Sequence, residues 1–355
     1  MSTATPRTTT LRAVAARWTE PDYGPRAEAV MKTLAADNRF TAESIAFSVN
    51  HATDLLAGDA IASWLGEIDA PRSTRLGIIS RGQTPTEGFL EAATATLAGF
   101  DLFLVPGQSS PALLAAFFEE AATALDDSFL RVGTESELFA DAGAVLALGN
   151  AHDRENWICQ AEKHGIPASR MMLREQRAGV AIITGTETRA ELSGLAEDIL
   201  LHEGGTPQSV RLLFAPEDLQ PDAVLEAMAG FREVFPPHPT TEGSFKMLAA
   251  FLEAAKQSHA VGPGFLVSKG DPEVQSGSHL RWVTYSEADE PVQWIGSHQE
   301  TVAYVAAAAP LADELAQDRT LQSTPILSFG DAHRPMPGQP PLTDELREFL
   351  RQRAS

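Results

Sequence analysis

The chain has 355 residues, of which 43% are hydrophobic, and it carries a formal net charge of −21 at pH 7. This length predicts two domains, or one large α/β unit with an insertion, and the apolar content is ample for a core. The charge argues against nucleic-acid binding, which needs clustered lysine and arginine, and no apolar run reaches the length of a membrane span.

The single cysteine, Cys159, excludes an intrachain disulfide and a metal site built from several cysteines. Residues 1–18 contain scattered arginines but no continuous apolar stretch, so no secretory signal is evident and we expect a cytoplasmic protein. Carboxylates are abundant and lysines are scarce. Two explanations fit this balance: adaptation to concentrated salt, which screens charge repulsion, or an acidic protein from a GC-rich genome.

The first 70 residues are expected to be mostly helical. Alanine-rich segments recur at Leu11–Arg17 and Arg26–Ala36, and apolar residues continue at helical spacing after Phe40. Thr41 is a suitable N-cap for this last stretch. Pro71 and the polar residues after it close the helical layer before the first strand.

Two βα units follow between Thr74 and Leu125. The pattern predicts strand Leu76–Ser80, helix Glu87–Ala98, strand Leu102–Val105 and a second helix beginning near Pro111. Successive βα units require a parallel sheet covered by helices. Ligands of such sheets bind at the carboxyl ends of the strands, so the loops Arg81–Thr86 and Pro106–Ser110 are candidate ligand loops.

A third candidate loop follows the apolar run Ala144–Leu148. Gly149 and Asn150 stand between this expected strand and a helix over Asp153–His164. Free amide groups at the start of a helix attract anions, including the phosphates of a nucleotide. A tight turn without a ligand has the same pattern, so spacing alone does not distinguish the two.

The second half of the chain also alternates between strands and helices. The expected strands are Val180–Ile183, Val210–Phe214, Gly264–Ser268, Leu280–Tyr285 and Val292–Ser297. The expected helices are Thr188–His202, Ala223–Phe235, Ser244–His259, Ser297–Ala309 and Thr343–Arg353. Gly204 and Gly205 end the helix before Val210, and the loop that they open is a further place for chemistry.

Motifs with a strong chemical meaning are absent from the sequence. There is no zinc-ligand spacing, Walker-type loop or G-x-S-x-G elbow. The histidines are dispersed, without a carboxylate at ligand spacing, so we expect surface or structural histidines and no metal. Cys159 lies in an expected helix beside Trp157, where nothing basic is placed to ionise it, and we interpret it as a small apolar side chain.

Five stretches nevertheless form a pattern that spans about residues 38–350. They are NRFTAESIAFSVN, TRLGIISRGQTPTEGFLEAATATLAGFD, VLALGNAHDREN, GVAIITGTETRAELSGLAEDILLHEGGTPQSVRLLFAPEDL and ILSFGDAHRP. In order and spacing they resemble the acyl-CoA reductase (LuxC-like) family of the aldehyde dehydrogenase superfamily. The resemblance implies an α/β, aldehyde dehydrogenase-like fold with a Rossmann-type parallel-sheet cofactor domain and an α/β catalytic domain.

The resemblance also implies a division of the chain. Residues 1–70 would form a helical layer of the cofactor domain, 71–178 the Rossmann-like cofactor domain, 179–325 the catalytic-type domain, and 326–355 a C-terminal segment. Members of this family usually form homo-oligomers through a β-extension of the catalytic domain, so a homo-oligomer is expected here.

In this family NADPH or NADH reduces an acyl thioester to an aldehyde. A cysteine thiolate takes the acyl group from CoA, hydride releases the aldehyde, and amide groups stabilise the oxyanion. By resemblance, Gln83 stands at the family's asparagine as a catalytic amide, and the cofactor-binding positions are Gly82, Gly149 and Asn150. Val105 and Pro106 stand where members offer a lysine.

The family's nucleophile loop departs furthest from the pattern. It reads Gly204, Gly205, Thr206 and Pro207, so it contains no cysteine, and Thr206 is its only hydroxyl. One hypothesis is therefore an NAD(P)H-dependent acyl-CoA reductase that works without a covalent intermediate. The alternative is a non-catalytic relative that binds a CoA ester, a nucleotide or a partner protein. The third hypothesis is that the chain shares only a doubly wound fold with this family and has a different function.

Overall fold

The computed structural model of the chain describes residues 6–66, 68, 75–175 and 177–354. The chain forms two compact units, each assembled from stretches that are far apart in the sequence. Unit 1 comprises residues 1–38, 45–176 and 335–355, and unit 2 comprises residues 39–44 and 177–334. The expected C-terminal segment 326–355 is therefore shared by the two units, and its helix belongs to unit 1.

Unit 1 is built around a five-stranded parallel sheet with the strand order β3-β2-β1-β4-β5. Its strands are β1 (Arg75–Ile79), β2 (Asp101–Val105), β3 (Leu130–Val132), β4 (Ala144–Gly149) and β5 (Met171–Glu175). β1 is central because its apolar run is buried after the first residue, and Leu76 pairs with both Leu102 and Ala144. The predicted Rossmann-type parallel sheet is confirmed.

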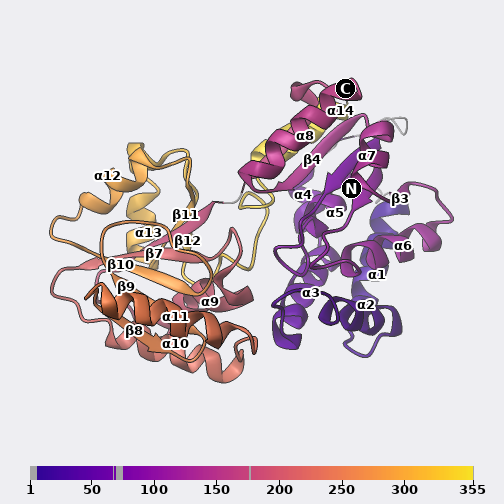
Figure 1. Cartoon of the computed structure of the whole chain (residues 1–355). Helices are drawn as coiled ribbons and strands as arrows, with labels where there is room; N and C mark the ends of the chain where they lie inside the picture. The colour runs from indigo at the N-terminus through magenta and orange to yellow at the C-terminus, as the bar shows by residue number, and fades with distance from the viewer. Residues whose placement is uncertain (1–5, 67, 69–74, 176, 355) are drawn as a thin grey trace. The chain divides into compact units, whose positions relative to one another are not determined.

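Helices cover this sheet, as Figure 1 shows in indigo to magenta, with the C-terminal helix in yellow. They are α1 (Pro6–Trp18), α2 (Gly24–Leu34), α3 (Ala42–Ala57), α4 (Ala60–Leu65), α5 (Phe89–Leu97), α6 (Leu113–Leu125), α7 (Glu135–Asp141), α8 (Ala151–Lys163) and α14 (Asp344–Ala354). Aromatic rings join three of them, because Phe117 of α6 contacts Trp18 of α1 and Phe89 of α5. The described part of the first 70 residues is thus mostly helical, as expected, while the expected closure at Pro71 lies outside the described residues.

Unit 2 contains a seven-stranded sheet with the order β12-β11-β6-β7-β10-β9-β8. Its strands are β6 (Ala178–Ile182), β7 (Val210–Pro216), β8 (His259–Gly262), β9 (Phe265–Lys269), β10 (His279–Tyr285), β11 (Val302–Ala307) and β12 (Ile326–Ser328). Every pair is parallel except β8 with β9, where a short hairpin adds an antiparallel edge. Both units are therefore α/β, as expected.

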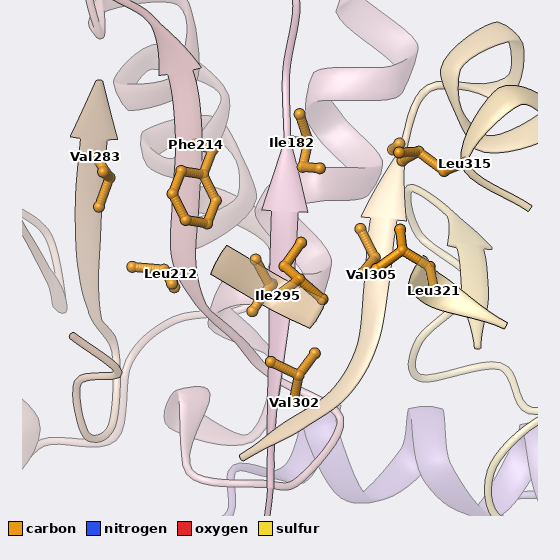
Figure 2. Packing of buried hydrophobic residues seen from close by; sticks show 11 residues of the cluster. Ile182, Leu212, Phe214, Val283, Ile295, Val302, Val305, Leu315 and Leu321 are labelled. Carbon is orange, nitrogen blue, oxygen red and sulfur yellow. The ribbon is translucent and has the colours of Figure 1, made fainter. Parts of the chain in front are cut away.

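The helices of unit 2 lie on both faces of its sheet. They are α9 (Arg189–Leu200), α10 (Asp222–Val234), α11 (Thr241–Ala254), α12 (Glu290–Ser297) and α13 (Ala309–Leu315). α12 and α13 cover one face, and α9 to α11 cover the other (Figure 1). Figure 2 shows the first face, where Phe214 and Val283 of the sheet share a buried cluster with Ile295 of α12.

Two predicted elements near the end of unit 2 are wrong. Val292–Ser297 was expected as a strand but lies in helix α12, where Pro291 occupies a first-turn position that favours helix. Ser297–Ala309 was expected as a helix, yet its central part is strand β11. The alanines of this segment favour helix in isolation, but Val302 and Val305 are buried in the sheet core, and this packing overrides local propensity.

The C-terminal boundary of another predicted helix is also wrong. The helix predicted over Ser244–His259 ends at Ala254, because the chain turns at Lys256 in a left-handed conformation and then forms the β8 edge.

Within the described residues no helix is both long and apolar enough to cross a membrane.

Candidate functional site

The loop after β1 is organised by one carboxylate. Glu87 accepts hydrogen bonds from the backbone N–H groups of Arg81 at 2.7 Å and Gly82 at 2.6 Å, and from the Ser80 hydroxyl at 2.7 Å. A longer bond from the Gln83 N–H reaches the same oxygen. Burial raises the pKa of Glu87, and these donors oppose that rise. The amide groups that a ligand phosphate would use in this loop are thus already bound to a side chain of the protein.

The loops after β1 and β2 also pack against each other. Gly82 has a φ of 72°, which glycine adopts without strain, and a Cβ there would lie 2.8 Å from the Ser110 backbone nitrogen. A Cβ on Gly107 would collide with the backbone of Arg81. The Ser110 hydroxyl donates to the carbonyl oxygen of Pro85 at 2.6 Å. The two predicted ligand loops therefore form one closely packed surface.

The junction after β4 is closed by a capping box. The Asn150 side chain accepts the backbone N–H of Asp153, and the Asp153 carboxylate accepts the backbone N–H of Asn150, each at 3.1 Å. This reciprocal arrangement satisfies two of the free amides at the start of α8. Gly149 is needed because a Cβ there would lie 2.8 Å from the Asp153 carboxylate and closer still to Trp157. Gly149 and Asn150 lie beside the β1 loop, since β4 pairs with β1.

Arg81 connects these loops. Its guanidinium pairs with Asp153 at 2.7 Å and with Glu135 at the start of α7, and it lies 4.8 Å from the centre of the Trp157 ring. Burial opposes ionisation of Asp153, but the bonds from Arg81 and the Asn150 amide lower its pKa overall. The ion pairs of Arg81 with Glu135 and Asp153 thus join the loops at the carboxyl ends of β1, β3 and β4.

Gln83 differs from its neighbours. Its side chain is half-buried, and its side-chain amide makes no hydrogen bond within the described residues. Val105 and Pro106 lie at the end of the adjacent strand and offer no cation. Gln83, Gly82, Gly149 and Asn150 therefore share one edge of the unit 1 sheet, whereas Thr206 belongs to unit 2.

These loops do not fit the phosphates of a dinucleotide. The amides of the β1 loop are bonded to Glu87, and Asp153 places a second carboxylate at the start of α8. Arg81 is already shared by two carboxylates. A phosphate here would have to displace a buried anion or lie beside it, and like charges at such distances repel.

In unit 2 the chain takes an unusual path as it enters the loop Gly204–Pro207. His202, Glu203 and Gly204 all have left-handed backbone angles, with φ values of 53°, 58° and 60°. Such a conformation costs energy at non-glycine residues, so the surroundings must hold it. Glu203 is the anchor, because it pairs with Arg232 at 3.1 Å and also accepts the Thr241 hydroxyl and the His238 N–H.

Thr206 is fully buried. Its hydroxyl is bonded to the Ser209 hydroxyl at 3.0 Å, and its carbonyl oxygen accepts the Arg211 guanidinium at 3.0 Å. Arg211 also donates to the carbonyl oxygen of Gly204. Gly205 is exposed and Pro207 is half-buried. These contacts make Thr206 a structural member of the loop.

A buried polar pair lies close to this loop and was not predicted. Asp198 and His333 are buried, and each has a side-chain atom without a hydrogen-bond partner among the described residues, Oδ1 and Nε2 respectively. The other Asp198 oxygen accepts the Gly330 N–H at 2.7 Å. Burial raises the pKa of Asp198 well above its usual range and lowers that of His333 to about 3. Because 134 residues separate the pair in sequence, no local pattern could have indicated it.

Two further expectations concern cysteine and metals. Cys159 is exposed on α8 and unbonded, so it does not pack as a core residue. No group of histidine, cysteine and acidic side chains among the described residues is arranged to hold a metal ion. Sequence reasoning placed Arg81 in a candidate ligand loop without assigning it a role, and it missed Glu87. The signal of Glu87 was weak, since a single acidic residue near a turn is common in any chain.

Neither a protein-family model nor a curated protein sequence matches this chain. Solved structures do. An oxidoreductase from Marinobacter aquaeolei matches with a TM-score of 0.69 and 15% identity, over 93% of this chain and 79% of that one. An NAD-dependent benzaldehyde dehydrogenase from Corynebacterium glutamicum matches with a TM-score of 0.66 and 15% identity, over 93% of this chain and 84% of that one.

A third match is a variant of the P. syringae indole-3-acetaldehyde dehydrogenase, in complex with NAD+. Its TM-score is 0.70 at 14% identity, and the match covers 91% of this chain and 76% of that one. At these identities the likeness establishes the fold. The chain has the aldehyde dehydrogenase-like fold that the sequence resemblance implied.

Proposed function

We propose that this protein is a non-catalytic relative of the NAD(P)H-dependent acyl-CoA reductases, which keeps their scaffold and binds a CoA ester or related acyl donor without reducing it. The observation that carries the proposal is the state of Thr206, the only hydroxyl in a loop without a thiol. It is fully buried and bonded to Ser209. Covalent acyl transfer needs an accessible nucleophile that a base can activate, and Thr206 has neither property.

The cofactor loops support the same proposal. A nicotinamide dinucleotide presents a pyrophosphate, which commonly binds to free amides at a helix start. In this chain Glu87 and Asp153 supply carboxylates to those amides instead. A protein that has lost the nucleophile no longer needs hydride delivery, so the two features are consistent with each other.

A second candidate is a reductase that acts on a bound carbonyl without a covalent intermediate. The unpartnered side-chain amide of Gln83 favours it, because such an amide can donate a hydrogen bond to a carbonyl oxygen. Two matched structures are described as NAD-dependent or as complexes with NAD+. In this candidate, NADPH or NADH would be the cofactor.

One pair of measurements separates the candidates. The first follows the absorbance of NADH and NADPH with a panel of acyl-CoAs, and the second measures thermal shifts with CoA, acyl-CoAs and each dinucleotide. We expect no turnover and a rise in melting temperature with CoA or acyl-CoA alone. Turnover would contradict the non-catalytic proposal, and an absence of any shift would contradict CoA-ester binding.

Variants then identify the residue responsible for any turnover. Gln83→Leu should abolish the activity of a cysteine-independent reductase. Gln108→Leu, an exposed glutamine in the neighbouring β2 loop, is the matched control. Cys159→Ser tests the single thiol of the chain. A loss of activity in this variant would contradict both candidates.

A further inference from the structure

The sheet of unit 2 has a point where its connections leave in opposite directions. β7 and β10 are adjacent and parallel, with Phe214 opposite Val283. The chain after β7 continues into α10 on one face, and the chain after β10 continues into α12 on the other (Figure 1). In open α/β sheets such a divergence leaves a crevice at the carboxyl ends of the strands, and ligands bind there.

A crevice of about 440 Å³ lies at this place. Its volume is in the range of small-molecule sites. Three aromatic side chains line it: Phe214 from β7, Tyr285 from β10 and Trp294 from α12. The rings of Phe214 and Trp294 are tilted against each other with their centres 5.6 Å apart. The Tyr285 hydroxyl donates a hydrogen bond to the carbonyl oxygen of Ile183 at 2.9 Å. The rings are therefore fixed by contacts within unit 2.

The crevice also carries charges of both signs. Lys269, at the end of β9, and Asp271, in the loop after it, line its edge, as does Thr284 of β10. None of these three side chains makes a hydrogen bond or ion pair within the described residues. Lys269 is one of only five lysines in a chain with a net charge of −21. Glu290, the first residue of α12, adds a second carboxylate.

We propose that this crevice binds a small zwitterionic aromatic molecule, of the kind of a free aromatic amino acid. The aromatic side chains would pack against its ring. Lys269 and Thr284 would bind its carboxylate, and Asp271 with Glu290 would bind its ammonium group. A ligand with only one of the two charges would leave the opposite charge of the crevice unmatched.

This site is separate from the nucleophile loop. Gly204 to Pro207 precede β7, whereas Phe214 lies near its carboxyl end. The intervening strand spans roughly 15 Å at a rise of about 3.3 Å per residue. The proposal therefore does not depend on whether the protein reduces or binds acyl-CoA, and either can fail without the other.

Titration calorimetry on the whole protein tests the proposal with four probes. They are L-phenylalanine, L-tryptophan, 2-phenylethylamine, which lacks the carboxylate, and 3-phenylpropionate, which lacks the ammonium group. We expect the amino acids to bind at least about tenfold more tightly than either singly charged probe, as the loss of one charge-assisted contact predicts. Equal affinities of amino acid and amine, or no saturable heat from any probe, would overturn the proposal.

Variants locate the binding. Lys269→Met should weaken amino-acid binding about tenfold and leave amine binding unchanged. Lys246→Met, an exposed lysine on α11 outside the crevice, is the matched control and should change neither. Thr284→Val, which is nearly isosteric, repeats the test without altering charge. Unchanged affinity in both Lys269→Met and Thr284→Val would refute the assignment, as would an equal loss in Lys246→Met.

Discussion

The carboxylate of Glu87 accepts the backbone N–H of Gly82 at 2.6 Å. With the bonds from Arg81 and Ser80, this contact places an internal anion on the amide groups at the end of the central strand β1. An anion supplied by the chain itself holds these groups by several hydrogen bonds and occupies the amides that an external phosphate would use. The same contact therefore bears on both stability and function.

Replacing Glu87 with alanine should lower the free energy of unfolding by about 2 kcal/mol, because several buried donors lose their acceptor. Urea unfolding measures this change. Glu119→Ala, an exposed position on α6, is the control and should stay within about 0.5 kcal/mol of the parent protein. Equal stability of the two variants would show that the Glu87 contacts carry no net free energy.

The stability of unit 2 should depend strongly on the buried ion pair of Glu203 and Arg232. Arg232→Met leaves an uncompensated buried carboxylate, and we expect a loss of about 3–5 kcal/mol. The double variant Glu203→Gln/Arg232→Met should be more stable than Arg232→Met alone. Arg189→Met, an exposed arginine on α9, serves as the control. A double variant that is less stable than the single one would contradict the charge-burial explanation.

Stability should fall on acidification because of His279. Burial, with a smaller effect from Arg281, lowers the pKa of His279 to about 4. Between pH 6.5 and 4 the unfolded chain binds a proton that the folded protein does not, so stability rises with pH in this window. One such group contributes at most about 1.4 kcal/mol per pH unit.

Urea unfolding at several pH values measures that slope. His279→Gln should reduce it, while His152→Gln, an exposed residue of α8, should leave it unchanged. Other buried histidines, including His333, will keep part of the slope. A slope identical in His279→Gln and the parent protein would mean that His279 is charged in the folded state.

Salt should stabilise the protein. At a net charge of −21, mutual repulsion of carboxylates opposes the compact state, and added salt screens it. We expect the melting temperature to rise with potassium chloride between low and molar concentration. An uncharged osmolyte at equal osmolality controls for solute exclusion. A fall in melting temperature with salt would exclude adaptation to concentrated salt.

Much of the fold followed from local patterns. Leu76–Ser80 and Leu102–Val105 are short apolar runs between glycine or charged residues, and such runs form buried strands wherever helices cover both faces of a sheet. Where a local signal competed with packing, the prediction failed. The alanine-rich segment around Val305 became a strand because its place between β6 and β12 requires extended chain.

By itself, the sequence determined the α/β class, the parallel sheet of unit 1, and the absence of a cysteine from the loop Gly204–Pro207, since these depend on composition, periodicity and residue identity. Only the tertiary structure decided that Glu87 binds the β1 amides, that Asp198 and His333 are buried near each other, and that Lys269 shares a crevice with Trp294. These relationships depend on which atoms approach within about 3 Å, and strand order and register set those distances.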